Sequence, residues 1–160
     1  INGLSKSVAM TGWRFGYLAS PNKALISAMN NLQSQSTSNI NSITQKAAIV
    51  ALNGEVDAEI EAMRQAFDAR AAEAVKLFNE IDGLSVLKPD GAFYLFVNTK
   101  EISNDSIAFC KELLQETGVA VVPGIGFGAE GYFRFSFATD IETIREGISR
   151  IKKFVESKRK

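Results

Sequence analysis

Hydrophobic residues recur at helical spacing in five segments of the chain. Three- and four-residue apolar spacing predicts amphipathic helices over residues 21–35, 40–52, 55–81, 105–116 and 141–155. The segment 55–81 is the longest, and at about 1.5 Å per residue it would reach about 40 Å, enough to bridge two domains. Asn53-Gly54 and Asp82-Gly83 bound this segment as turn signals.

Other segments have the patterns of strands. Residues 119–122 and 132–138 predict two strands, with a glycine loop between them. Residues 84–87 and 92–97 predict a hairpin-like pair, joined by the turn Lys88-Pro89-Asp90-Gly91. With the last helix covering them, these strands form a small sheet, so the pattern favours a mixed α/β fold.

Alternation places an arginine on a half-buried strand. Tyr132, Arg134 and Ser136 fall on one face of the segment 132–138, and three phenylalanines fall on the other. A charge there needs an anionic partner, which is either an acidic side chain in a structural ion pair or an anionic ligand.

Gly124, Gly126 and Gly128 have the spacing of a nucleotide-binding loop. Such loops follow a strand and open a helix whose N-terminus binds phosphate, whereas here a strand follows. We therefore interpret these glycines as turn residues that shape the approach to a substrate site.

Composition is that of a water-soluble domain. The 160 residues are 46% hydrophobic and 22% charged, with a formal net charge of zero, so nothing indicates a nucleic-acid partner. The longest apolar runs, such as residues 92–97, are far shorter than the roughly 20 residues that span a bilayer, and no cleavable signal is expected. We expect a cytoplasmic protein without a membrane partner.

The absence of histidine removes several kinds of site. Ser-His-Asp and Cys-His mechanisms and all histidine-based metal sites are excluded, and no metal is expected. Cys110 is the single cysteine and lies in an amphipathic pattern, which predicts a buried core thiol and not a catalytic one.

The chemistry-bearing segment is Ile1 to Tyr17, with Lys6 among small residues and Arg14 eight positions later. A lysine amine can bond covalently to the aldehyde of pyridoxal phosphate, and an arginine offers a planar fork for its phosphate. Taken singly, the usual fate of such residues is a solvated surface lysine or an arginine in an ordinary ion pair.

This run, and Met10-Thr11-Gly12-Trp13-Arg14 above all, resembles the lysine signature of class I and II aminotransferases, most closely the aspartate aminotransferase group. The resemblance implies that Lys6 holds pyridoxal 5'-phosphate through a Schiff base and moves a proton between the substrate α-carbon and the cofactor. It also implies that Arg14 binds the cofactor phosphate, and Ser5 is a further candidate for that contact.

Two later segments are similar to the same family. The stretch from Val119 to Ala138 is similar to the one whose arginine binds the substrate α-carboxylate, so the resemblance assigns that role to Arg134. The run Pro89-Asp90-Gly91-Ala92-Phe93-Tyr94 resembles the family's small domain.

The resemblance also implies the organisation of the chain. We expect a C-terminal fragment of a fold-type I pyridoxal-phosphate transferase. In it, residues 1–62 are the end of the cofactor-binding large domain and residues 63–160 are an α+β small domain, with the boundary inside the long helix 55–81. Residues that contact the cofactor ring would lie in the missing N-terminal part.

The expected function is that of an amino-acid aminotransferase, with aspartate aminotransferase foremost, which transfers an amino group to a 2-oxo acid. Two alternatives stay open: a pyridoxal-phosphate-dependent lyase on the same scaffold, and a non-catalytic small-domain module. We expect the 160-residue fragment alone to be inactive. The full-length protein is expected to be a homodimer, with the polar run Ser34 to Asn39 facing the partner.

Overall fold

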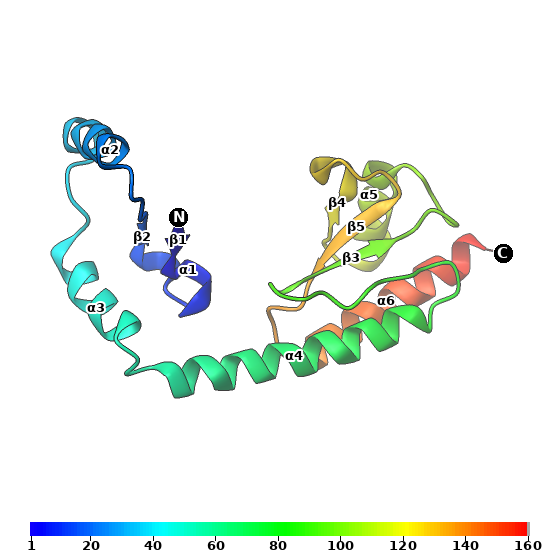
Figure 1. Ribbon diagram of the computed structural model, residues 1–160. Coiled ribbons are helices and arrows are strands. Elements are labelled where there is room, and N and C mark those ends of the chain that lie inside the picture. The colour runs from blue at the N-terminus through cyan, green and yellow to red at the C-terminus, as the bar shows by residue number, and fades with distance from the viewer. Residues whose placement is uncertain (160) are drawn as a thin grey trace. The chain divides into compact units, whose positions relative to one another are not determined.

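The computed structural model describes residues 1–159, and the chain divides into two compact units, Ile1–Met63 and Arg64–Lys160 (Figure 1). The division falls inside the helix α4, Asp57–Asn79. Each unit has a hydrophobic core of its own, with the larger one in the second unit.

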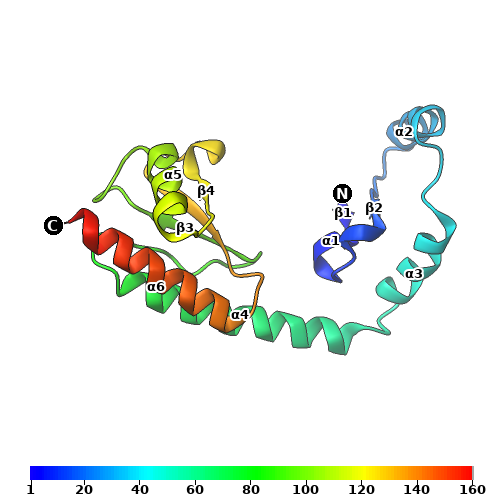
Figure 2. The same cartoon turned by 180° about the vertical axis from the view of Figure 1, so that it is seen from behind.

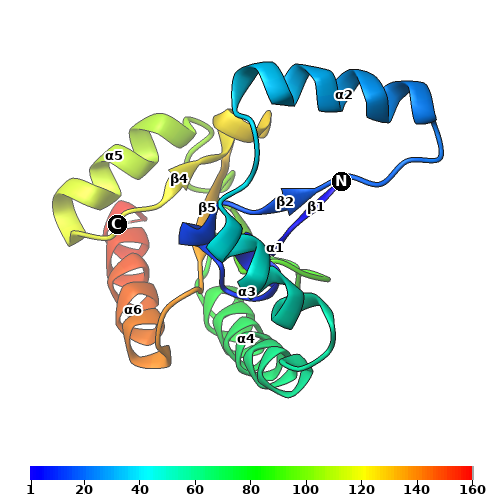
Figure 3. The same cartoon turned by 90° about the vertical axis from the view of Figure 1, so that its left-hand side faces the viewer.

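The first unit contains short strands followed by two helices. In chain order its elements before α4 are β1 (Asn2–Gly3), α1 (Leu4–Ser7), η1 (Thr11–Trp13), β2 (Gly16–Tyr17), α2 (Lys23–Ser36) and α3 (Ser42–Leu52). β1 and β2 lie side by side (Figure 3) and pair antiparallel, and the register places Asn2 opposite Tyr17. The side chains of Asn22 and Asn41 accept hydrogen bonds from backbone N–H groups in the first turns of α2 and α3. Both predicted helices are confirmed, with starts set by these caps.

The second unit is an antiparallel sheet with helices. After α4 its elements are β3 (Tyr94–Asn98), α5 (Ser106–Thr117), β4 (Val122–Pro123), η2 (Gly124–Phe127), β5 (Tyr132–Ser136) and α6 (Ile141–Lys158). The strand order is β3-β5-β4, with β5 paired to both neighbours. The predicted helices 55–81, 105–116 and 141–155 are confirmed as α4, α5 and α6. The strand predicted at 119–122 is shorter than expected and lies at Val122–Pro123.

One face of this sheet carries the core. Leu95 and Val97 of β3 and Phe133 and Phe135 of β5 are buried together with apolar side chains of α4, α5 and α6. Phe78 of α4 makes edge-on ring contacts with both phenylalanines of β5. Figures 1 and 2 show α4 and α6 side by side along this unit. The predicted alternation is confirmed, and the residues of the other sheet face are less buried.

The predicted pairing of residues 84–87 with 92–97 is wrong. β3 pairs along its whole length with β5, and the earlier segment contributes a single antiparallel bridge between Ser85 and Asn98. The reason is local: the side-chain amide of Asn79 donates to the carbonyl of Val86 at 3.0 Å and accepts from its N–H at 2.9 Å. Because Asn79 satisfies both backbone groups of Val86, no ladder is needed there.

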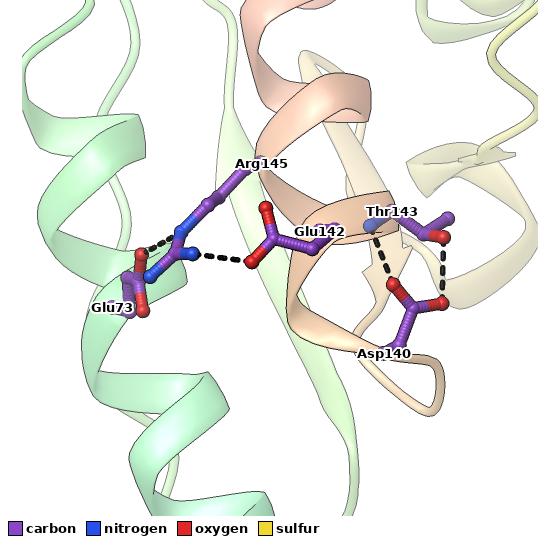
Figure 4. A network of polar contacts seen from close by, with 5 residues as sticks. All are labelled: Glu73, Asp140, Glu142, Thr143 and Arg145. Atoms are coloured by element: carbon purple, nitrogen blue, oxygen red, sulfur yellow. Dashed lines mark hydrogen bonds and ion pairs between the residues drawn. The ribbon is translucent and has the colours of Figure 1, made fainter.

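Polar contacts fix α6 at its N-terminal end (Figure 4). Asp140 caps the helix by accepting hydrogen bonds from the hydroxyl of Thr143 at 2.6 Å and from its N–H at 2.8 Å, and these bonds lower the pKa of Asp140 to about 2. Arg145 pairs with Glu73 of α4 at 2.5 Å and with Glu142 at 2.6 Å. The pair with Glu73 joins α6 to α4, and the other contacts stabilise the first turn of α6.

Candidate functional site

Lys6 lies in α1, a single helical turn that follows directly on β1. Its side chain is exposed, and Ser5 beside it is partly buried. Leu4, at the start of the turn, is buried against Met10 and Ala48, so the backbone that carries Lys6 is fixed to the small core of the first unit. The amine therefore extends from an anchored turn.

Hydrogen bonds connect this turn to the segment that carries Arg14. The N–H of Leu4 donates to the carbonyl of Phe15 at 3.3 Å, and the N–H of Met10 donates to the carbonyl of Leu4 at 3.2 Å. Thr11 adds a side-chain bond, from its hydroxyl to the carbonyl of Ser5 at 2.8 Å. Lys6 and Arg14 are thus carried by one hydrogen-bonded segment.

Arg14 has a left-handed backbone conformation, with φ 54° and ψ 50°. A residue with a β-carbon rarely adopts a positive φ, and among residues 1–159 Ala9 on the same segment is one of three others that do. The guanidinium donates one hydrogen bond, to the carbonyl of Thr11 at 3.2 Å. Among residues 1–159 no carboxylate lies within ion-pair distance of Arg14. Its other N–H groups can serve an anion.

Thr44 is a supporting residue that the sequence did not reveal. Its side chain is 6% exposed, and its hydroxyl donates to the carbonyl of Trp13 at 3.3 Å, which ties the start of α3 to the residue before Arg14. The sequence signal was weak, because a threonine near a helix N-terminus is ordinary.

Arg134 lies on β5 in the second unit, on the sheet face opposite the core, and is partly buried. Its guanidinium carbon is 4.2 Å from the ring centre of Tyr94 and 4.7 Å from that of Phe127. Within the described residues it makes no ion pair and no hydrogen bond. None of the acidic side chains in the described part of the chain forms the ion pair that a structural role would require.

The two rings on Arg134 are contacts that sequence reasoning missed. Tyr94 lies on β3 two residues before the partner of Arg134 in the ladder, Phe96, and Phe127 ends the turn η2. A diagonal cross-strand position could have suggested Tyr94 once β3 was paired with β5, but the sequence indicated another partner for β3. Nothing in the pattern pointed to Phe127.

The glycine loop is a tightly built turn. A β-carbon on Gly124 would lie 2.2 Å from the carbonyl oxygen of Ala129, so only glycine fits there. Gly128 closes the turn with φ 75°. The expectation of strand, loop and strand is confirmed, and a β-carbon on Gly126 would meet no atom within 4 Å, so packing does not require glycine there.

Cys110 is buried in the core of the second unit, as predicted. Burial, with a smaller contribution from Glu130, raises the pKa of its thiol to about 11, which keeps it protonated at neutral pH.

Among residues 1–159 no cluster of three potential metal ligands is found. None of the described helices is both long enough and apolar enough to cross a membrane.

The family model for aminotransferase class I and II matches residues 1–151. The chain belongs to this family. The matched range includes the Lys6 segment and the Arg134 strand, and enzymes of this family depend on pyridoxal phosphate.

Curated relatives agree with the family. The chain is 49% identical to the aspartate aminotransferase of Bacillus subtilis (strain 168), covering 98% of this chain and 40% of the relative. It is 47% identical to the aspartate/prephenate aminotransferase of Nitrosomonas europaea, covering 94% of this chain and 40% of that protein. It is equally similar, at 47%, to the asparagine–oxo-acid transaminase of Streptococcus mutans. The chain spans about 40% of the length of these relatives.

Solved structures share the fold. The aspartate aminotransferase of Rhizobium meliloti superposes with a TM-score of 0.92 at 40% identity, over 97% of this chain and 41% of that one. The aromatic aminotransferase of Pyrococcus horikoshii gives a TM-score of 0.94 at 37% identity, over 99% of this chain and 42% of that one. The expected fold class, part of an aminotransferase with a small antiparallel sheet and helices, is confirmed.

Proposed function

We propose that the full-length protein containing this chain is a pyridoxal-phosphate-dependent aminotransferase that moves an amino group from an amino acid, foremost aspartate, to a 2-oxo acid. The observation that carries the proposal is Arg134, a partly buried guanidinium with no acidic partner among the described residues. An α-carboxylate, which both an amino acid and a 2-oxo acid possess, would supply the missing anion.

The residues of the first unit suit the cofactor by their chemistry. Lys6 offers an exposed amine for the cofactor aldehyde, and Arg14 has N–H groups available for the phosphate. Ser5, next to Lys6, offers a hydroxyl as a further phosphate contact. When bound, pyridoxal phosphate supplies the electron sink that lets a bond at the substrate α-carbon break.

The protein's own tasks are then positioning and proton transfer. Arg14 would orient the phosphate end of the cofactor from a backbone held in the left-handed region. Arg134 would hold the substrate carboxylate. Lys6 would take a proton from the substrate α-carbon and return it on the cofactor side.

Domain roles belong to the same proposal. We infer that residues 1–62 are the end of the cofactor-binding large domain and residues 63–160 the small domain. The division into units at Met63 and Arg64 supports this, as does its place inside α4.

We also propose a homodimer located in the cytoplasm. Exposed apolar side chains on α2 and α3, Leu32 and Ile43 among them, support association with further protein surface.

Product analysis of the full-length protein tests the proposed function. With pyridoxal phosphate, 15N-labelled L-aspartate and 2-oxoglutarate, an aminotransferase yields labelled glutamate and oxaloacetate. A lyase would release labelled ammonia and a keto acid instead, and a non-catalytic module would leave both substrates unchanged. Lys6→Ala should abolish label transfer, and Arg134→Gln should raise KM for both substrates. The 160-residue chain alone should show no transfer.

A further inference from the structure

The ring of Phe127 has no role in the core. It is 51% exposed and lies outside the buried cluster of the second unit. The ring contacts the guanidinium of Arg134 and the ring of Phe96, whose centre is 5.9 Å away at an interplanar angle of 85°. Phe96 in turn stacks on Tyr132 at 5.3 Å. An exposed aromatic side chain that packs on an arginine and on a row of rings needs an explanation other than burial.

The backbone under Phe127 is held in place on both sides. The N–H of Ile125 donates to the hydroxyl of Ser106 at 3.2 Å, and Ser106 is 1% exposed. The carboxylate of Glu130 accepts from the N–H groups of Ser106 at 2.9 Å and of Gly131 at 3.3 Å, and these bonds lower the pKa of Glu130. The N–H of Ala129 also donates to the carbonyl of Gly124 at 3.1 Å, which closes the loop on itself.

A ring and a carboxylate orient a guanidinium in different ways. A carboxylate occupies two N–H donors and must be displaced before a ligand can take them, whereas a ring attracts the cation through its face and leaves the N–H edges available. Tyr94 and Phe127 contact the guanidinium at 4.2 and 4.7 Å from their ring centres, and the guanidinium of Arg134 makes no hydrogen bond among the described residues. The contacts that orient the guanidinium among these residues are therefore the two rings.

We propose that Phe127 is a positioning residue, which with Tyr94 holds the guanidinium of Arg134 ready for a substrate carboxylate without using the N–H groups that the carboxylate needs. The inference rests on the proposed role of Arg134. It assigns to the glycine loop a task beyond turning the chain: the loop presents one aromatic face to the cation.

Fluorinated phenylalanines at position 127 of the full-length protein provide the sharpest test. Each added fluorine weakens the negative face of the ring with little change of shape, so a purely structural role would not respond. The readout is the Kd of L-malate, measured by calorimetry, because malate has the carboxylates of aspartate and no amine to react. We expect Kd to rise with every fluorine, up to between about two- and thirty-fold, the range that cation–π attraction allows.

Conventional variants give a second readout. Phe127→Leu should raise KM for the amino acid and for the 2-oxo acid together while kcat changes little, and Phe127→Trp should retain wild-type values. Ile125→Ala is the matched control, since this side chain is exposed on the same loop and has no recorded contact with Arg134. The proposal is overturned if the Kd of malate does not change with the number of fluorines, or if the Phe127→Leu protein binds malate as tightly as wild type.

The malate measurements distinguish failure of the proposed positioning role of Phe127 from failure of the proposed function. If Arg134→Gln weakens malate binding and fluorination does not, the carboxylate role stands and Phe127 has no part in it. If wild type and Arg134→Gln bind malate equally, the proposed carboxylate role of Arg134 is wrong, and the positioning role of Phe127 is wrong with it.

Discussion

The hydroxyl of Thr11 donates to the carbonyl of Ser5, the residue directly before Lys6, at 2.8 Å. The carbonyl of the same threonine accepts a hydrogen bond from Arg14. Thr11 therefore connects Ser5 and Arg14, two of the three residues assigned to the cofactor, and a substitution of Thr11 can break the first bond without changing either residue.

Thr11→Val should weaken cofactor binding. Valine keeps the shape of threonine but cannot donate to Ser5, and a hydrogen bond of this kind contributes about 1 kcal/mol, so we expect the Kd for pyridoxal phosphate to rise roughly fivefold. Equilibrium dialysis of the full-length protein measures this. Thr11→Ser keeps the hydroxyl and should bind like wild type, and equal affinity in all three proteins would show that the bond has no such role.

Cys110 should react slowly with thiol reagents in the folded protein. Its pKa is raised to about 11, above the ordinary value of 9.0, so at pH 8 little thiolate is present and burial limits access. We expect labelling by a disulfide reagent to be at least about a hundredfold slower than in denaturant. Rapid labelling of the native protein at pH 8 would contradict the buried assignment.

The same shift predicts how stability depends on alkaline pH. The folded state keeps the Cys110 proton to a higher pH than the unfolded state, so the contribution of this group is fully present below about pH 9 and is lost as pH rises toward 11. Cys110→Ala should flatten that part of the curve. Urea unfolding midpoints of both proteins between pH 8 and 11 measure the difference.

Asp140 should stabilise α6 in a way that acid removes. Its pKa is lowered from 3.8 to about 2, so its contribution is present above about pH 4 and is lost as pH falls toward 2. Asp140→Ala should lower the thermal midpoint by several degrees at pH 7. The gap from wild type should shrink over that acidic window.

Asp140→Asn is the control for this cap. Asparagine accepts the N–H of Thr143 without a charge, so it should recover much of the lost stability and show no acidic transition. If the gap between wild type and Asp140→Ala is unchanged from pH 7 to pH 2, the ionised carboxylate is not what caps the helix.

The sequence predicted Lys6, Ser5, Arg14 and Arg134 as candidate site residues, and the alternation of β5 correctly predicted on which sheet face Arg134 lies. It could not find what holds these residues. Thr44 bonds to Trp13 across 31 residues, and Phe127 contacts Arg134 across an irregular turn, so neither contact follows a helical or strand period in the sequence.

The misplaced hairpin has a similar cause. Turn residues 88–91 between two apolar runs predict a hairpin from local sequence. In the structure β3 instead pairs with β5, which is the central strand and lies more than thirty residues later in the chain. The sequence also did not indicate the hydrogen bonds between the Asn79 side chain and the backbone of Val86, because a single asparagine near a helix end usually indicates only a cap.

The most direct test of the central claim is chemical mapping of the cofactor on the full-length protein. The protein is incubated with pyridoxal phosphate, reduced with borohydride, digested, and examined by peptide mass spectrometry. The account predicts one modified lysine, Lys6, in the peptide that contains Ser5. Modification of a different lysine, or of none, would contradict the assignment of Lys6 and with it the proposed aminotransferase mechanism.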